Sequence, residues 1–481
     1  MGKIEFTSGV GNGYGVGVGV SGGSAELMKV MIMGEGGTGV YMGSTETLKM
    51  TSVDISGFEK GVSVGGGKVE MNMGSITIKS GVGSGNYGVG VWGTADATLM
   101  GTKIKGDGKG MGMYATGTGK MLMMSDVRIS GVGMGVDATK GNLVMHKGSV
   151  EFKGNYGIYL IRGNALLNDI TITGPGDKST GMYVGSSGKI IMKDVTMSRV
   201  GVGAWVTNGG AMWLGDTHLK DVQNGMIVTQ GSTVGMEGGE ITFKGSYGVY
   251  LDKGGAALKD VKMTYMGSND AVDFMTVQGG KVIAKDIQIY GNGYGQGMKV
   301  TQRGHVVLIK PTYTNVDKGM TISEGAVRVF GGSVEFKGKY GVSLTRGIAT
   351  LKGVKMTYKG SSSTADFMTV RGGKVMAESI QINGNGYGQG VKVNGGYVVL
   401  IRPSLNKVRT GVTIQNAEVT MISSSINFTG GYGVNLHVGK AILKSSRDKH
   451  TRVTIVQISL KLVVKVQSLF FSFEVFFVYV F

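Results

Sequence analysis

Short runs of alternating apolar and polar residues, separated by glycines, recur along most of this chain. The stretch "MLMMSDVRISGVGMGV", which begins at Met121, shows two such runs followed by a third, shorter one. Alternation with a period of two is typical of a strand that buries one face. We therefore expect Met124 to point inward and Met123 outward. By the same rule Leu122, Val127 and Ile129 are predicted to point inward, and Asp126, Arg128 and Ser130 outward.

These runs belong to a repeat. Consecutive units read "MLMMSDVRISGVGMGVDATKGN", "LVMHKGSVEFKGNYGIYLIRGN" and "ALLNDITITGPGDKSTGMYVGSSGK", so the units are of similar length and each holds three runs. A longer period covers four units: residues 273–300 and 366–393 are identical at 22 of 28 positions, at an offset of 93. Three short strands in each unit predict an all-β, right-handed parallel β-helix of about 19 coils. One coil cannot bury its apolar face alone, so stability comes from stacking.

The repeat covers residues 1–444 and is absent from residues 445–481. The last glycine is Gly439, and the chain ends in "VVKVQSLFFSFEVFFVYVF". This tail is apolar and basic, has high β-propensity and lacks proline. We expect it to be a non-native or disordered extension whose removal raises solubility and leaves the coils intact.

Composition narrows the choice of protein class. Glycine accounts for 90 of 481 residues, but proline for only 3, and glycine has no three-residue period, which excludes collagen. The chain has no cysteine, so a disulfide, a zinc–thiolate site and a cysteine nucleophile are all excluded.

The stretch "GNGYGQG" occurs at Gly291–Gly297 and again at Gly384–Gly390. A phosphate-binding loop needs Gly-Lys-Ser/Thr at the start of a helix, and a dinucleotide fingerprint also needs a helix. Here "MKV" or "VKV" follows, which continues as a strand. The stretch is therefore predicted to be a turn at the second corner of a coil.

Candidate catalytic residues are few. Hydrolases that act on polysaccharides need two carboxylates close together, and lyases need a calcium-binding carboxylate cluster with a basic residue. No Asp-Asp pair occurs, and the histidines (His146, His218, His305, His437 and His450) are scattered. The group that most resembles a catalytic site is His218 with Asp216 and Asp221 near it in the sequence. We therefore expect no catalytic residue, no metal site and no cofactor; a solvent-facing histidine is the simpler interpretation of His218.

The net charge says more about function than the candidate catalytic residues do. The chain has 50 basic and 32 acidic residues, a net charge of +18. Lysines follow a recurring phenylalanine in "FKGNYG", "FKGSYG" and "FKGKYG", which makes Lys153, Lys244 and Lys337 candidate contacts for a linear polyanion such as a sulfated glycan. The alternative is a solvated face that keeps the solenoid soluble.

The units "KVMIMGEGGTGVYM", "SDVRISGVGMGV" and "GSVEFKGNYGIYL" resemble the passenger repeats of Bartonella autotransporters, over about residues 1–440. The resemblance implies a type V secreted protein on the bacterial surface or released from it, with adhesion to host cells as its role and no catalytic residues. The family also has a cleavable signal and a translocator barrel, which we do not find in this sequence. We therefore expect a passenger fragment.

The expected function is non-enzymatic adhesion to a host-cell receptor or polyanionic glycan, with no nucleic acid bound and no membrane span within the coils. Two alternatives stay open: a polysaccharide-active β-helix enzyme, and the product of a decayed gene with no present function.

Overall fold

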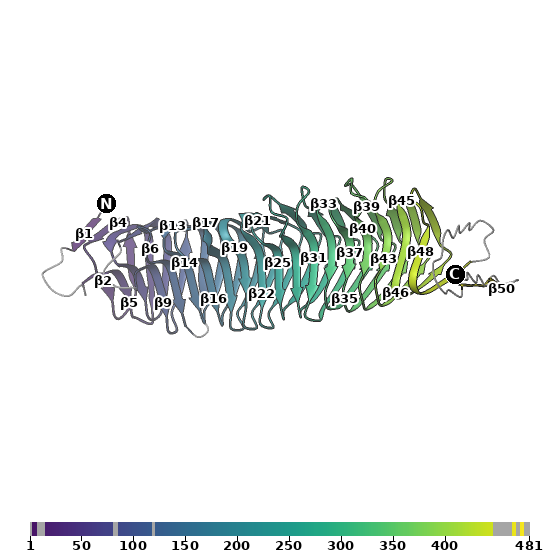
Figure 1. Cartoon of the computed structure of the whole chain (residues 1–481). Coiled ribbons are helices and arrows are strands. Elements are labelled where there is room, and N and C mark those ends of the chain that lie inside the picture. The colour runs from purple at the N-terminus through teal and green to yellow at the C-terminus, as the bar shows by residue number, and fades with distance from the viewer. Residues whose placement is uncertain are drawn as a thin grey trace. The chain divides into compact units, whose positions relative to one another are not determined.

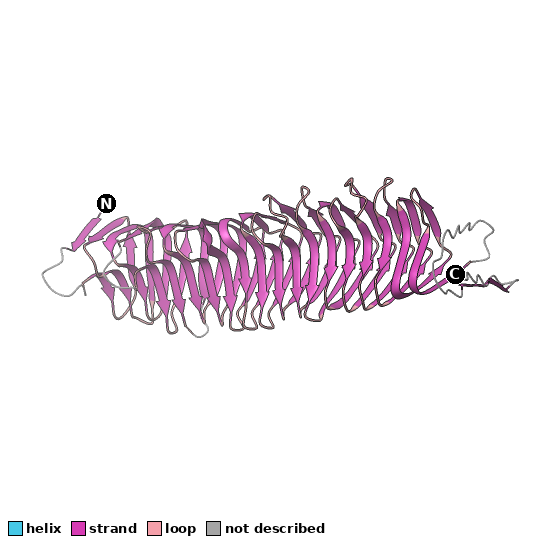
Figure 2. Ribbon diagram, viewed as in Figure 1, coloured by secondary structure: helices cyan, strands magenta, loops and turns pink. Residues whose placement is uncertain are grey.

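The computed structural model describes residues 2–6, 15–79, 85–117, 121–445, 464–467 and 472–475. These residues form strands and turns, and none of them lies in a helix (Figure 2). The chain winds through about 19 turns of parallel β-solenoid, which confirms the fold predicted from the repeats. It divides into two compact units, Met1–Lys244 and Gly245–Phe481, called unit 1 and unit 2 below.

Each coil contributes a strand to three sheets, here called the first, second and third faces in the order in which the chain meets them. Successive coils of a unit lie side by side (Figure 1). In unit 1, for example, Leu99 pairs with Met124, which pairs with Met145. The coils pair in parallel and in register along each face, with local register shifts such as the one between Ile129 and Val132, so equivalent side chains stack in rows.

Strands of the first face are β3 (Ala25–Met28), β10 (Asp96–Met100), β18 (Lys189–Lys193), β20 (Ala211–Gly215) and β23 (Thr233–Glu237) in unit 1, and β26 (Gly255–Lys259), β29 (Lys281–Lys285), β32 (Gly304–Ile309), β35 (Gly325–Phe330), β38 (Ile348–Lys352), β41 (Lys374–Glu378) and β44 (Tyr397–Ile401) in unit 2. Strands of the second face are β1 (Gly2–Phe6), β4 (Val30–Gly34), β11 (Lys103–Lys105), β21 (His218–Val222) and β24 (Glu240–Phe243) in unit 1, and β27 (Lys262–Tyr265), β30 (Gln288–Tyr290), β33 (Thr312–Val316), β36 (Ser333–Phe336), β39 (Lys355–Tyr358), β42 (Gln381–Asn383), β45 (Ser404–Val408) and β47 (Ser425–Phe428) in unit 2.

Strands of the third face are β2 (Val16–Val20), β5 (Thr38–Met42), β7 (Lys60–Val64), β9 (Tyr87–Trp92), β12 (Met111–Thr116), β14 (Met134–Thr139), β16 (Tyr156–Ile161) and β22 (Asn224–Thr229) in unit 1, and β25 (Tyr247–Asp252), β28 (Asp273–Gln278), β31 (Gln296–Thr301), β34 (Lys318–Ile322), β37 (Tyr340–Leu344), β40 (Asp366–Val370) and β43 (Gln389–Val393) in unit 2. Longer strands continue round a corner: β6 (Thr47–Phe58), β8 (Lys68–Ile78), β13 (Met121–Val132), β15 (Asn142–Phe152), β17 (Asn164–Gly185), β19 (Thr196–Val206), β46 (Thr410–Ile422) and β48 (Val434–Lys444).

The inward rows form the core of each unit, as the alternation predicts. Met124 is 2% exposed, whereas its neighbour Met123 is 44% exposed. Leu122, Val127 and Ile129 are also buried, while Asp126 and Arg128 are exposed and Ser130 is half-buried. The alternation rule therefore holds even where methionine occupies an outward position.

A glycine recurs at the second position of the third-face strands, as in the "YG" of "NYGIYL". A Cβ atom on Gly157 would lie 2.6 Å from the carbonyl oxygen of Gly181 in the next coil and 2.7 Å from Cγ2 of Ile172. Both neighbours belong to the packed interior, so a side chain cannot be accommodated there without moving the coils apart. Much of the glycine content is therefore a requirement of close coil packing.

The structure describes eight residues beyond Ser445, in two strands, β49 (Val464–Gln467) and β50 (Ser472–Val475), which pair in antiparallel fashion. The rest of the predicted tail, residues 446–463, 468–471 and 476–481, lies outside the described residues. That they are a non-native extension remains a prediction.

Candidate binding surfaces

The repeated stretch "GNGYGQG" is a turn between strands. Its first copy joins β30 to β31 and its second joins β42 to β43. Asn292 takes a left-handed conformation with φ 51°, and its side-chain amide donates a hydrogen bond to the carbonyl oxygen of Tyr265 at 3.0 Å. Asn385 makes the same bond to the carbonyl oxygen of Tyr358, at 3.2 Å. The asparagine thus ties the turn to the preceding coil, and a strand follows it where a phosphate loop requires a helix.

The three lysines singled out in the sequence occupy equivalent corners. The backbone N–H groups of Lys153, Lys244 and Lys337 donate to the carbonyl oxygens of Val132, Val222 and Val316, in each case one coil earlier. Their side chains differ in surroundings. All three are exposed, but Lys244 pairs with Asp221 at 2.5 Å and the Lys337 ammonium lies 5.3 Å from the centre of the Tyr294 ring. Lys153 has no such partner among the described residues. Two of the three charges therefore have local partners already.

The structure does not bring a catalytic group together around His218. Asp221 is engaged by Lys244, and no hydrogen bond or ion pair between described residues joins His218 to Asp216 or Asp221. His146 and His437 form hydrogen bonds with the side-chain amides of Asn168 and Asn435. His305 is exposed, and His450 lies outside the described residues. Within the described part of the chain, no three His, Asp or Glu side chains are grouped as metal ligands.

Basic charge is concentrated in unit 2. Residues 245–444 hold 24 basic and 11 acidic side chains, a net charge of +13, whereas residues 1–244 hold 21 and 19, a net charge of +2. A polyanion that approaches the coils is therefore attracted mainly to unit 2.

Within unit 2, exposed basic side chains follow one edge, where the third face turns into the first. We call this group the basic edge: Lys253, Lys281, Arg303, Arg346, Arg371 and Lys374. Backbone hydrogen bonds join the coils here, for example from Lys281 N to Gly254 O at 3.0 Å and from Lys374 N to Gly347 O at 2.9 Å. With coils about 4.8 Å apart, the edge extends over about 24 Å. Only Arg303 is ion-paired among these six in the described structure, with Glu324 at 3.5 Å.

The "FKG" motif does not predict the basic edge, because its lysines lie at a different corner of the coil. The signal was present in a second motif, a basic residue beside the glycine that precedes the first-face strand, as in "TQRG", "LTRG" and "VRGGK".

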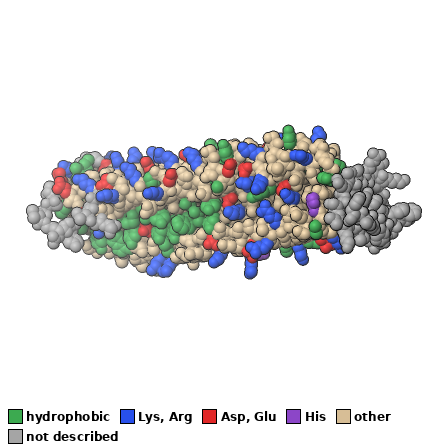
Figure 3. All heavy atoms as spheres, viewed as in Figure 1, with side chains coloured by type: hydrophobic (Ala, Val, Ile, Leu, Met, Phe, Trp, Pro, Cys, Tyr) green, Lys and Arg blue, Asp and Glu red, His purple; other side chains and the backbone are tan. Residues whose placement is uncertain are grey.

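The third face of unit 1 carries a row of aromatic side chains. Its central outward position is occupied in successive coils by Tyr114, Asp137, Tyr159, Tyr183 and Trp205, which are paired in register. We call the four aromatic residues the aromatic ladder. All are half-buried, and hydrophobic side chains gather on this part of the face (Figure 3). The rings of Tyr159 and Tyr183 stack with their centres 4.9 Å apart and an interplanar angle of 13°.

Asp137 interrupts this ladder. It is half-buried and accepts a hydrogen bond from the Thr139 hydroxyl at 2.8 Å. Burial raises the pKa of the Asp137 carboxyl, and the hydrogen bond from Thr139 opposes the shift. No described basic side chain forms an ion pair with Asp137. Its charged form is therefore disfavoured by its surroundings.

This shift makes a prediction for stability. Because the folded state holds the Asp137 proton to higher pH than the unfolded chain does, stability falls as pH rises through the interval between the ordinary and the raised pKa. Replacing Asp137 by Asn should therefore raise the melting temperature at pH 7, and this gain should vanish below about pH 3, where the carboxyl is protonated in both states. Thermal melts at the two pH values measure the difference; an equal gain at both would contradict the assignment.

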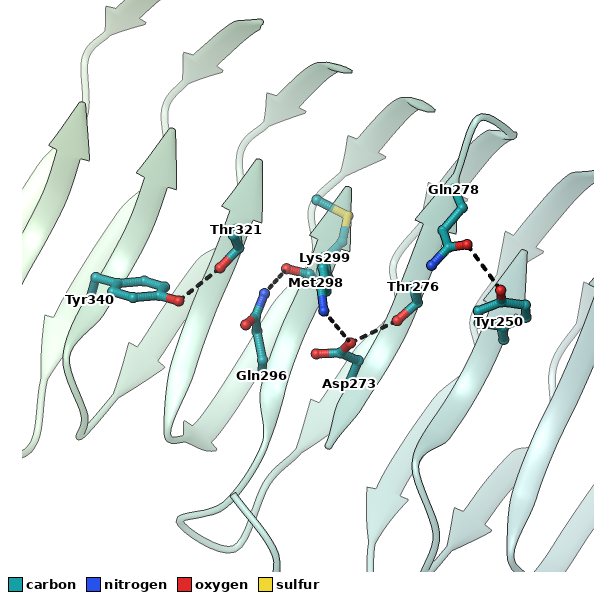
Figure 4. Close-up of polar contacts among 9 residues, drawn as sticks. All are labelled: Tyr250, Asp273, Thr276, Gln278, Gln296, Met298, Lys299, Thr321 and Tyr340. Atoms are coloured by element: carbon teal, nitrogen blue, oxygen red, sulfur yellow. Dashed lines mark hydrogen bonds and ion pairs between the residues drawn. The ribbon is translucent and has the colours of Figure 1, made fainter. Parts of the chain in front are cut away.

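In unit 2 the third face is polar (Figure 4). Asp273 accepts a hydrogen bond from the Thr276 hydroxyl at 2.9 Å and lies 3.9 Å from the Lys299 ammonium. Tyr250 donates to Gln278, while the hydroxyl groups of Thr321 and Tyr340 share a hydrogen bond of 2.9 Å.

The 93-residue repeat reproduces the aspartate of this network. Asp366 accepts from the Thr369 hydroxyl at 2.7 Å. Burial raises the pKa of both carboxyls, against the effect of the threonine hydroxyl and of nearby lysines. The residues that pair in register with Asp273, Tyr247 and Gln296, are not acidic.

No family model, no curated protein and no solved structure matches this chain. Among the described residues, no helix is both long and apolar enough to span a membrane.

Proposed function

We propose that the chain is a non-enzymatic passenger of a Bartonella-type autotransporter, displayed on or released from the bacterial surface, and that it adheres to a polyanionic glycan on the host cell. The observation that carries the ligand assignment is the basic edge. Six exposed basic side chains lie along this edge, interrupted at one coil by Glu324, and present charge at a spacing that suits a linear anionic chain. The passenger assignment rests on the repeat sequences quoted above.

Binding should be sensitive to salt, because exposed charges are screened beyond about 8 Å at 0.15 M ionic strength. The affinity of the full chain for labelled heparin should therefore be measurable at low salt and fall steeply towards physiological salt. If the chain does not bind heparin at low salt, the proposal is wrong.

A charge-matched pair of variants locates the site. The edge variant replaces four basic-edge residues with glutamine: Lys281, Arg346, Arg371 and Lys374. The control replaces four exposed lysines of unit 1 in the same way: Lys103, Lys105, Lys189 and Lys193. Both lose four positive charges, so the two variants have the same net charge. We expect the edge variant to lose about tenfold or more in affinity, from about 0.2–1 kcal/mol for each exposed contact, and the control to lose much less.

Equal losses in the two variants would mean that net charge alone attracts heparin. Tighter binding of DNA than of heparin would assign a different ligand. Shortening of the heparin chains during the same incubation would instead favour the alternative predicted from the fold, a polysaccharide-active enzyme.

A further inference from the structure

A notch lies in the aromatic ladder of unit 1, at the coil of β14. The side chains at its central outward position in the coils before and after are Tyr114 and Tyr159, and between them the shorter Asp137 occupies the row. Neighbouring strands are about 4.8 Å apart, so the strands that carry the two tyrosines are about 9.6 Å apart. The notch is therefore one coil wide, with a carboxylate at its floor.

Each wall of the notch is backed by a second ring. Tyr159 stacks on Tyr183, and Tyr114 stacks on Tyr87 with ring centres 6.1 Å apart and an interplanar angle of 26°. Tyr159 and Tyr183 are in register in neighbouring coils, so their stacking turns a face of the Tyr159 ring along the solenoid axis, towards the coil of Asp137. Tyr87 pairs in register with Met111 and stands outside the row, so it supports the Tyr114 ring from the side.

The charges around the notch indicate the charge of the ligand that it would bind. The face of an aromatic ring carries negative charge density, so both walls and the floor of the notch favour a cation. On the third face of unit 2, Asp273 lies 3.9 Å from the Lys299 ammonium, whereas Asp137 is not paired with any described basic side chain. A cation above Asp137 would lie one strand spacing, about 4.8 Å, from the strand of each tyrosine, and a cation–π contact extends to about 6 Å from the ring centre.

We propose that this notch binds an organic ammonium group of the choline type. A quaternary ammonium fits better than a metal ion, because two of its three contact surfaces are aromatic rings and the third is one carboxylate already bonded to Thr139. This site lies in unit 1, apart from the basic edge, and its ligand has the opposite charge. The tests of the ammonium site and of the polyanion proposal are therefore independent of each other.

The test is a titration of the full chain with choline chloride, followed by saturation-transfer NMR on the choline methyl groups. The uncharged isostere 3,3-dimethyl-1-butanol serves as the matched probe. We expect choline to bind at least tenfold more tightly than the isostere. Equal binding of the two would show a merely apolar surface and overturn the proposal.

Four variants assign the contacts. Asp137→Asn keeps the shape of the floor and removes its charge, so choline affinity should fall at least tenfold, although the variant is expected to be more stable than the native chain. Tyr159→Leu removes a wall and should lose binding to a similar degree, while Tyr159→Phe keeps the ring and should retain it. Tyr41→Leu is the control, since Tyr41 occupies the same row between Gly19 and Ser63, without a carboxylate beside it.

Unchanged affinity in Asp137→Asn, or an equal loss in Tyr41→Leu, would overturn the assignment. Vesicles of phosphatidylcholine and of phosphatidylglycerol then separate the two sources of the group. Binding to the first only identifies a lipid headgroup as the ligand. Binding of free choline without either vesicle identifies a soluble ammonium compound.

Discussion

Replacing Phe336 by alanine will destabilise unit 2 by about 3–5 kcal/mol, the usual cost of deleting a fully buried aromatic side chain. Phe336 ends β36 and has no exposed surface. Its ring centre lies 5.2 Å from that of Tyr358 and 5.3 Å from that of Phe367, so it joins an aromatic cluster from neighbouring coils. The cavity left by alanine is lined by rigid backbone and large rings that cannot collapse into it.

Phe330 provides the matched control, because it is a phenylalanine of the same unit at the outward end of β35 and is 39% exposed. Phe330→Ala should change stability by no more than about 0.5 kcal/mol. Urea unfolding followed by circular dichroism, with hydrogen exchange to locate the loss, compares the two variants. Similar shifts of the urea midpoint would mean that the second-face corner is not part of the cooperative core.

A single methyl group at Gly239 should have an effect of comparable size. Gly239 has φ 81°, a conformation that costs an L-residue about 1–3 kcal/mol. An added Cβ would also lie 2.1 Å from the carbonyl oxygen of Thr217 and 2.8 Å from its nitrogen. That carbonyl accepts a hydrogen bond from the backbone N–H of Glu240, so the preceding coil cannot move away without losing it. We expect Gly239→Ala to lower the unfolding midpoint of unit 1 markedly.

Gly22→Ala is the corresponding control in unit 1, since no atom lies within 4 Å of the Cβ position at Gly22. It should be nearly neutral in the same urea titration. If Gly239→Ala also proves neutral, the coils are more loosely stacked than the carbonyl contacts indicate.

Local pattern was sufficient for features that depend on one coil. The alternation around Met123 and Met124 correctly assigned one outward and one inward side chain, because strand geometry alone decides which way each points. The residues after "GNGYGQG" were enough to predict a turn. That Asn292 reaches back to Tyr265, in the preceding coil, was not visible in the motif, because this contact exists only when two coils are stacked.

The candidate sites show the opposite case. The "FKG" motif makes Lys244 a candidate contact for a polyanion, yet Lys244 pairs with Asp221 from the coil before. The sequence pattern does not indicate a site at Asp137, because a single aspartate in "GMGVDA" resembles many other surface carboxylates. Its surroundings follow from Tyr114 in the coil before and Tyr159 in the coil after.

By itself, the sequence determined the repeat, the three strands of each coil and the inward or outward direction of their side chains, because these depend on local geometry and on the burial of apolar rows. The tertiary structure decided which outward side chains meet. Coils differ in length. Fewer residues of the chain therefore separate Asp137 from Tyr159 than separate Tyr159 from Tyr183, although each pair is in register. Register between coils is set by the hydrogen bonds and core packing of whole strands. Side chains that form a surface site are therefore brought together by that packing, and their spacing in the chain does not reveal it.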